Sequence, residues 1–204
     1  MKKMEKRKKN KKEIRNISAD LELRTITDEE NEEKRTVGGY ALKYNQQSDV
    51  LRDYWGDEFV EEFAEGAFDE SLQERNQKAL WNHKSEYPLG SVKSGTLRFN
   101  SDSTGLGYDI DLPNNSWGDD ALESIKRGDV DGSSFGFKVT NDKWSETEID
   151  GKTILKRTVL EAELYEVSPV TFPAYNSSDV KLRSLKDYKE NKDKIKRLVL
   201  LTKI

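Results

Sequence analysis

The sequence contains no cysteine and only one histidine, and these shortages exclude several classes of site. Without cysteine the chain can form no disulfide, no thiolate zinc site and no cysteine nucleophile. A single imidazole excludes metal sites that need two, including the HExxH type. No apolar run approaches the roughly 18–20 residues that span a membrane, and no apolar stretch follows the Lys-rich amino terminus, as a secretory signal requires. We therefore expect a soluble, intracellular protein.

Hydrophobic residues are also scarce, at 33% of the 204 residues against 36% charged residues. The chain nevertheless holds four Trp, eight Tyr and seven Phe, which are enough to anchor a core. Its length suits one domain of ordinary size with tails.

The charges are segregated along the chain. Residues 1–15 hold nine basic and two acidic residues (net +7), and residues 184–204 hold seven and three (net +4). The remaining body holds 19 basic and 34 acidic residues, a net charge of −15. We predict a basic disordered tail at 1–16, one folded domain at 17–183 and a basic tail at 184–204. Basic tails can bind nucleic acid, but we do not expect it as the principal partner because the acidic body repels phosphate.

Alternation of apolar and polar residues predicts a β-rich α+β fold. Helices are predicted at two places, one starting near Ala67 and one at 116–127 with a Ser116–Asp119 capping box and Gly128 after its end. The predicted strands are 17–26, 36–44, 78–84, 94–100, 105–113, 134–144 and 152–172. Such an arrangement forms a small β-barrel or a strongly bent sheet with helices packed outside it.

His83 is the one imidazole that could act as a general base near neutral pH. In the segment KALWNHK (78–84), strand alternation places it on one face with Ala79 and Trp81. The alternative is a packed or surface histidine without a chemical role.

Ser134 lies in the segment DGSSFGFKV (131–139). Alternation directs Phe135 and Phe137 to the core and leaves Ser134 on the other face with Gly136, where a substrate backbone has room to approach. Ser133 would point with the phenylalanines. The alternative is a polar residue on a solvated strand, because a serine is a nucleophile only if a base reaches it.

Glu166 continues an otherwise apolar row in the segment LEAELYEVSPV (160–170). The row in phase with it consists of Leu160, Ala162 and Leu164. A carboxylate on a core-facing row needs a partner; an imidazolium would serve, as would an arginine such as Arg157 or Arg183. One β-bulge would reverse this assignment of faces.

Several of these segments occur together in one known family. They are GAF-x-x-SL (66–72), WNH (81–83) followed by PLG (88–90), GLGYDIDLP (105–113), the x-SFGF strand (133–137) and EVSPVTFPAY (166–175). The combination resembles the prohead (capsid maturation) serine proteases of tailed bacteriophages, which are related in fold to the herpesvirus assembly proteases. The resemblance covers roughly residues 36–183.

The resemblance implies a β-barrel surrounded by helices, like that of the herpesvirus proteases, with 17–183 as the protease domain. It implies Ser134 as the nucleophile, His83 as the base and Glu166 as the third member, with Glu163 as the runner-up. Backbone amides near Gly90 or Gly95 are candidate oxyanion donors. No metal or organic cofactor is required.

The implied function is that of a serine endopeptidase that cleaves capsid or scaffold proteins and itself. It would act inside the assembling prohead, in the cytoplasm of the bacterial host, with a second copy of the chain as a further partner and no membrane. Because the two tails fall outside the resemblance and lack apolar periodicity, we expect self-cleavage within or close to residues 1–35 or 176–204.

Three other functions compete with this one. A non-catalytic scaffold or capsid-assembly protein would keep the same fold, and a nucleic-acid-binding module would use the Lys-rich ends. A glycosidase would need a specific pair of carboxylates, and no motif selects one among the 39 acidic residues. Self-cleavage of the chain expressed alone distinguishes a protease from a scaffold.

Overall fold

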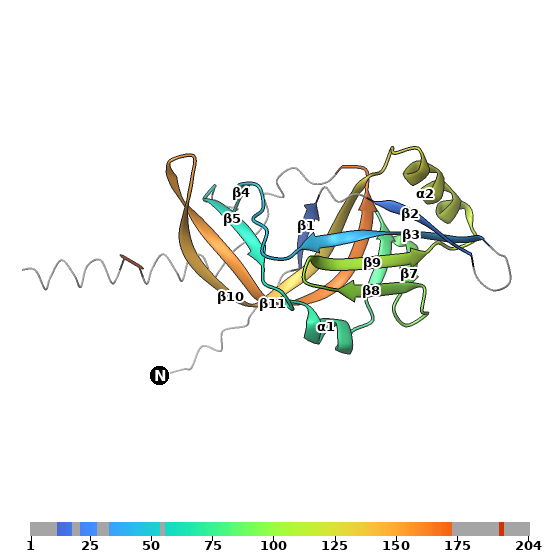
Figure 1. The fold of residues 1–204 in the computed structure, drawn as a ribbon, viewed down its shortest axis with the longest axis horizontal. Helices are drawn as coiled ribbons and strands as arrows, with labels where there is room; N and C mark the ends of the chain where they lie inside the picture. Colours follow the sequence, from blue (N-terminus) through green and yellow to red (C-terminus); the bar gives the residue numbers. More distant parts are fainter. Residues whose placement is uncertain (1–11, 18–20, 28–32, 54–55, 173–191, 194–204) are drawn as a thin grey trace, which may run out of the picture.

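The computed structural model describes residues 12–17, 21–27, 33–53, 56–172 and 192–193, drawn in colour in Figure 1. These residues contain eleven strands and two helices that the following bounds define. The strands are β1 (Glu13–Ile17), β2 (Glu22–Thr27), β3 (Glu33–Lys43), β4 (Leu51–Arg52), β5 (Glu58–Phe63), β6 (Lys78–Trp81), β7 (Lys84–Ser91), β8 (Leu97–Ser101), β9 (Gly105–Asp111), β10 (Gly132–Ile149) and β11 (Lys152–Val170). The helices are α1 (Asp69–Glu74) and α2 (Ser116–Lys126). Within the described ranges, no helix is long and apolar enough to cross a membrane.

The strands form two sheets. The larger sheet has the order β1-β10-β11-β5-β4, with β6 also paired to β11 and β7 paired to β6. The smaller sheet has the order β2-β3-β9-β8. All pairs are antiparallel except those of β11 with β5 and with β6, which are parallel. β11 therefore has β10 on one side and, at different points along its length, β5 and β6 on the other.

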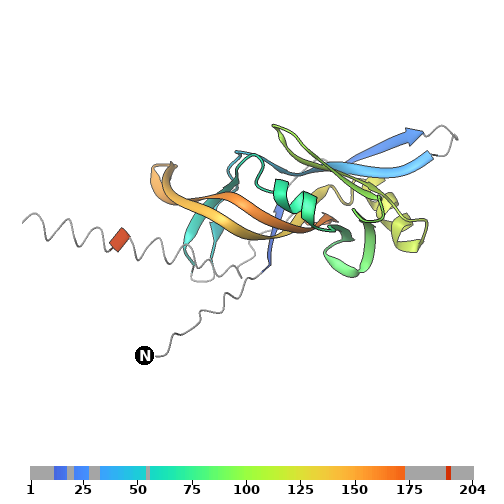
Figure 2. The same ribbon diagram turned by 90° about the horizontal axis from the view of Figure 1, so that it is seen from below.

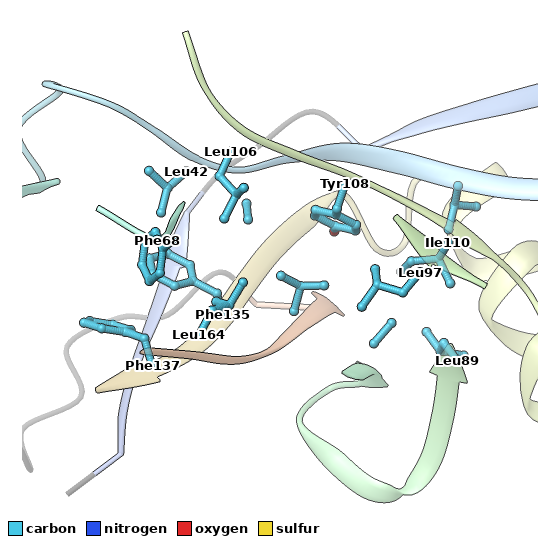
Figure 3. Close-up of a cluster of buried hydrophobic side chains, with 14 of the residues drawn as sticks. Leu42, Phe68, Leu89, Leu97, Leu106, Tyr108, Ile110, Phe135, Phe137 and Leu164 are labelled. Atoms are coloured by element: carbon cyan, nitrogen blue, oxygen red, sulfur yellow. The ribbon is translucent and has the colours of Figure 1, made fainter. Parts of the chain in front are cut away.

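The hydrophobic core lies between the two sheets, as Figure 3 shows. Tyr108 and Ile110 of the smaller sheet contribute to the same buried cluster as Phe135 and Phe137 of β10. Phe68, next to α1, meets both β10 rings edge to face, at centroid distances of 6.1 and 6.3 Å. Because Phe135 and Phe137 of β10 both point into the core, the residues that alternate with them lie on the face of the strand that points away from the core.

The hairpin of β10 and β11 is the longest feature of the fold. Its strands have 18 and 19 residues, and the turn at Asp150 and Gly151 uses left-handed φ angles of 51° and 73°. The outer half extends away from the two-sheet core in both views (Figures 1 and 2). A separate small cluster around Phe59 packs there against Trp144 and Leu155.

The prediction of a β-rich fold with few helices is confirmed. The barrel is wrong for the described residues, because their strands form two open sheets and no closed barrel. The hairpin of 134–144 with 152–172 is confirmed by β10 and β11. A single strand over 17–26 is wrong, since β1 ends at Ile17 and β2 begins at Glu22.

The first basic tail is shorter than its charge suggests. Residues 13–16, predicted to be disordered, form most of β1 by pairing with β10. Residues 1–11 of this tail, and all of the second tail except 192–193, lie outside the described residues.

The N-cap of helix α2 lies one residue before the predicted one. The N-cap is Asn115, whose side chain accepts a hydrogen bond from the amide of Gly118 at 2.9 Å. The predicted capping box of Ser116 and Asp119 is therefore wrong, because Ser116 is already the first helical residue. Gly128 follows the helix with a left-handed φ of 76°, as predicted.

This cap gives a test of the fold. Asn115→Ala should lower the free energy of unfolding by about 0.5–2 kcal/mol, because the Gly118 amide loses its acceptor. Ser116→Ala, in the first turn, should change it by less than about 0.5 kcal/mol. Urea denaturation of the two variants beside the wild type measures both values, and a larger effect at Ser116 would contradict the assigned cap.

Candidate active site

His83 lies in a tight turn and not on a strand. β6 ends at Trp81, and the two turn residues, Asn82 and His83, have left-handed φ angles of 49° and 61° before β7 begins at Lys84. Two successive left-handed residues are typical of the two-residue hairpin turn whose twist matches the flanking strands. The prediction that His83 shares a strand face with Ala79 and Trp81 is therefore wrong.

The turn is attached to the end of β11. The Asn82 amide donates to the carbonyl of Pro169 at 3.1 Å, and the Asn82 side chain accepts from the Thr171 amide at 3.1 Å. The His83 amide donates to Ser168 Oγ at 3.3 Å. These bonds, together with the parallel pairing of β6 to β11 at Glu166 and Val167, hold the imidazole beside β11.

Glu166 is the partner of this imidazole. Its Oε1 lies 2.9 Å from His83 Nδ1, and its Oε2 accepts a hydrogen bond from Ser168 Oγ at 2.8 Å. Lys12 Nζ also contacts Oε1, at 3.1 Å. Burial alone would raise the pKa of Glu166, but the hydrogen bond and charge of His83, with Lys12 and Ser168, outweigh it and hold the pKa below its ordinary value. The carboxylate is thus ionised and can accept a hydrogen bond from Nδ1–H of His83.

A bulge in β11 brings Glu166 to this position. Phe137 pairs with Leu164 and Gly136 with Glu166, so Tyr165 is an extra residue without an opposite partner. Leu164 therefore faces the core, and Glu166 turns to the opposite face. The prediction that Glu166 continues the apolar row is wrong for this reason, although the predicted imidazole partner is observed.

Gly136 provides the space that the carboxylate occupies. A Cβ at this position would collide with Glu166 Oε1 and with the end of the Lys12 side chain. A residue without a side chain is thus needed between Ser134 and Lys138 on this face of β10.

Ser134 lies on the same face as Glu166. It is opposite Ser168 in the β10–β11 register, so both side chains point to one side of the sheet. Ser134 is fully buried, and its Oγ donates to the carbonyl oxygen of Arg15 in β1 at 3.0 Å. Ser133 points the other way, and its Oγ lies 2.9 Å from the Tyr108 hydroxyl in the core. The predicted faces of the two serines are confirmed.

His83 Nε2 is the atom through which this imidazole could accept a proton. In the neutral ring, an Nδ1–H that donates to Glu166 leaves the lone pair on Nε2. Nε2 is buried and has no hydrogen-bond partner among the described residues. The structure thus brings His83, Glu166 and Ser168 into contact, while Ser134 bonds Arg15 instead of His83.

Two residues were alternatives in the sequence: Glu163 for the third member of the triad and Arg157 for the partner of Glu166. Both contact other residues instead. Glu163 accepts from Arg75 at 2.7 Å and from the Tyr165 hydroxyl at 2.8 Å, and it also contacts Lys138. Arg157 bonds other carboxylates, those of Glu13, Glu61 and Asp142. Arg183 lies outside the described residues.

The two candidate oxyanion donors, the amides of Gly90 and Gly95, lie in different local structures. The Gly95 amide donates to the Val92 carbonyl at 3.0 Å, so it is already used in this conformation. Gly90 lies within β7, opposite Ala79 of β6, and its role stays a prediction. In the described part of the chain, no group of three or more His, Asp or Glu side chains could hold a metal ion.

Sequence reasoning missed three residues of the site. Ser168 could have been found from its spacing, because it lies two residues after Glu166 and therefore on the same face of the strand. Asn82 carries a weaker signal, the tolerance of asparagine for left-handed turns. Lys12 carries none, because its position depends on the pairing of β1 with β10 across more than 100 residues of sequence.

The model of the caudovirus prohead serine protease family matches residues 20–193, which include every residue of the site except Lys12 and Arg15. No curated protein and no solved structure matches the chain. The family match covers most of the chain, and it agrees with the resemblance of the motifs around His83, Ser134 and Glu166. This chain therefore belongs to the caudovirus prohead serine protease family.

Proposed function

We propose that this chain is a serine endopeptidase that cleaves capsid or scaffold proteins, and itself, during prohead maturation. It acts inside the assembling shell in the cytoplasm of the infected bacterium. Family membership supports the general role. The observation that carries the proposal is the 2.9 Å contact between half-buried His83 and buried Glu166, because Glu166 lies on the same face of the sheet as Ser134.

In this proposal Ser134 is the nucleophile, and His83 Nε2 takes its proton as Oγ attacks the scissile carbonyl carbon. The Ser134 hydroxyl must first leave the Arg15 carbonyl and turn to His83. Glu166 fixes the Nδ1–H tautomer and stabilises the imidazolium that forms. Because the pKa of Glu166 lies below its ordinary value, the carboxylate stays charged at neutral pH.

Ser168 has a positioning role in the same proposal. Its hydroxyl donates to Glu166 Oε2, and its oxygen accepts from the His83 amide. One side chain thereby fixes both the carboxylate and the backbone that carries the imidazole. Since Ser168 is fully buried, this arrangement is shielded from competition by water.

The two adjacent serines test the nucleophile. Ser134→Ala should reduce proteolysis by roughly 10⁴- to 10⁶-fold while the protein stays folded, with a loss of about 1 kcal/mol for its bond to the Arg15 carbonyl. Ser133→Ala should keep substantial activity but lose about 1–3 kcal/mol of stability, because the buried Tyr108 hydroxyl loses its partner. Cleavage assays and thermal denaturation of both variants measure these effects. If Ser133→Ala is the inactive variant, the nucleophile is misassigned.

The two glutamates and the histidine test the other members. Glu166→Gln should slow cleavage by roughly 10⁴-fold, because a neutral amide neither fixes the tautomer nor stabilises the imidazolium. Glu163→Gln removes the same charge from the neighbouring position and should change the rate only a few-fold. His83→Ala should leave no more than residual turnover. A near-normal rate in His83→Ala would rule out the triad, and a larger effect at Glu163 would transfer the third role to it.

Self-processing is tested with the full chain alone. Incubated wild-type protein should lose segments within or close to residues 1–35 or 176–204 and keep an intact body, as measured by intact mass spectrometry. Ser134→Ala should keep both ends. Equal trimming of the two proteins would indicate a contaminating protease, and no trimming of either would favour the non-catalytic scaffold.

A further inference from the structure

The edge of β10 that carries Ser134 is occupied by the chain's own amino-terminal segment. Among the described residues, β1 is an edge strand of the larger sheet and pairs only with β10, over Ser133 to Phe137. Removal of β1 would leave the backbone groups of these residues open to another strand. An open strand edge is one of the recurring ways in which proteins bind an extended peptide.

The register places one peptide bond of β1 beside the Ser134 hydroxyl. Asn16 is opposite Ser134, and Arg15 is opposite Phe135. Ser134 Oγ lies 3.0 Å from the Arg15 carbonyl oxygen, which belongs to the Arg15–Asn16 peptide bond. A peptide bound in this register would present the bond after its arginine to the nucleophile.

The Arg15 side chain occupies a buried acidic site. Its Nε donates to Glu61 Oε1 at 2.6 Å and its Nη2 to Glu61 Oε2 at 3.2 Å, a two-point contact. The guanidinium also lies 5.4 Å from the centre of the Phe137 ring. Arg15 is only 8% exposed and Glu61 2%, so the charged pair is almost fully removed from water.

A second ion pair joins the peptide to the body two residues earlier. Glu13 Oε2 accepts from Arg157 Nη1 at 3.0 Å and from Arg15 Nη2 at 2.9 Å. Arg157 also bonds Glu61 at 3.0 Å and Asp142 at 2.7 Å. Of this buried group, the body supplies Glu61, Asp142 and Arg157, a net charge of −1, and the segment adds one cation, Arg15, and one anion, Glu13.

We infer that the β10 edge is the substrate-binding strand and that it selects peptides with arginine before the scissile bond and glutamate two residues before that arginine. Glu61 recognises the arginine, and Arg157 recognises the glutamate. The chain's own Glu13-Ile14-Arg15 segment is the first such substrate, cleaved between Arg15 and Asn16. This inference rests on the proposed protease function and deepens it.

The reaction at this bond uses only the groups already named. Ser134 Oγ bonds to the Arg15 carbonyl carbon, the Arg15–Asn16 C–N bond breaks, and the Ser134 proton passes through His83 to the Asn16 amine. Water then hydrolyses the ester, which releases the Arg15 carboxylate and restores the serine hydroxyl. Departure of residues 1–15 removes Lys12 from Glu166 and opens the edge beside Phe135, Gly136 and Phe137 to other substrates.

The test is intact mass spectrometry and amino-terminal sequencing of the incubated full-length chain. Wild-type protein should yield a new amino terminus at Asn16 that is absent in Ser134→Ala. Arg15→Gln should slow this cleavage by at least about 100-fold, because the buried Glu61 carboxylate loses its two-point contact with Arg15 and keeps only the bond to Arg157. Arg15→Lys should be intermediate, since it keeps the charge but not the two-point contact.

Glu61→Gln and Glu62→Gln form a matched pair on β5. Both remove one carboxylate, but Glu62 bonds Lys156 and Thr158 and not Arg15. Glu61→Gln should slow cleavage after Arg15, and Glu62→Gln should not. Since Glu61→Gln could also weaken the fold, self-processed wild-type protein should be given a synthetic peptide of residues 10–20, with Arg15 or with glutamine in its place. Only the arginine peptide should be cut.

Two outcomes separate this inference from the function on which it rests. The first outcome is Ser134-dependent cleavage at other bonds, with the Arg15–Asn16 bond intact or with Arg15→Gln cut at the wild-type rate. This outcome overturns the inference about Arg15 but not the proposed protease function. β1 would then be a structural strand. Absence of Ser134-dependent cleavage at any bond, in the chain or the peptides, overturns both.

Discussion

The antiparallel pairing of β10 with β11 positions every other part of the site. Ser134 lies on β10 and Glu166 with Ser168 on β11, so their separation follows from the strand register. β6 pairs with β11 and delivers the turn that carries His83, and β1 pairs with β10 on its other edge. The same hairpin supplies Phe135 and Phe137 to the core. A change of register by one residue would therefore exchange core and site residues together.

Local sequence patterns were sufficient for most of the fold and for part of the site. Alternation in the SFGF segment separated Ser134 from Ser133 correctly, because the two phenylalanines have one face on which they can be buried. The long hairpin and the second helix were also recognisable, since Asp150-Gly151 and Gly128 mark turns that only a few residue types tolerate. These features depend on neighbours within a few positions of the chain.

The errors concern features set by distant contacts. The bulge at Tyr165 reverses the face of Glu166, and a bulge has no signature in a row of alternating residues. His83 was assigned to a strand because WNH continues an apolar segment, whereas pairing of β7 back onto β6 ends the strand at Trp81. β1 was assigned to a tail because its charges are typical of solvated segments. Those charges are buried only where Glu61 and Arg157 compensate them.

The parallel pairing of β11 with β5 and β6 has a consequence for the newly made chain. Strands β5 and β6 can pair only after β11 has been synthesised, about 90 residues later in the chain. Pairing over such a long sequence separation forms slowly. A chain that has been translated only through β10 contains His83 and Ser134 but not Glu166, Ser168 or the strand that holds the His83 turn. The candidate site is therefore assembled only after β11 has been made, so that topology alone keeps His83 apart from its partner Glu166 in a shorter chain.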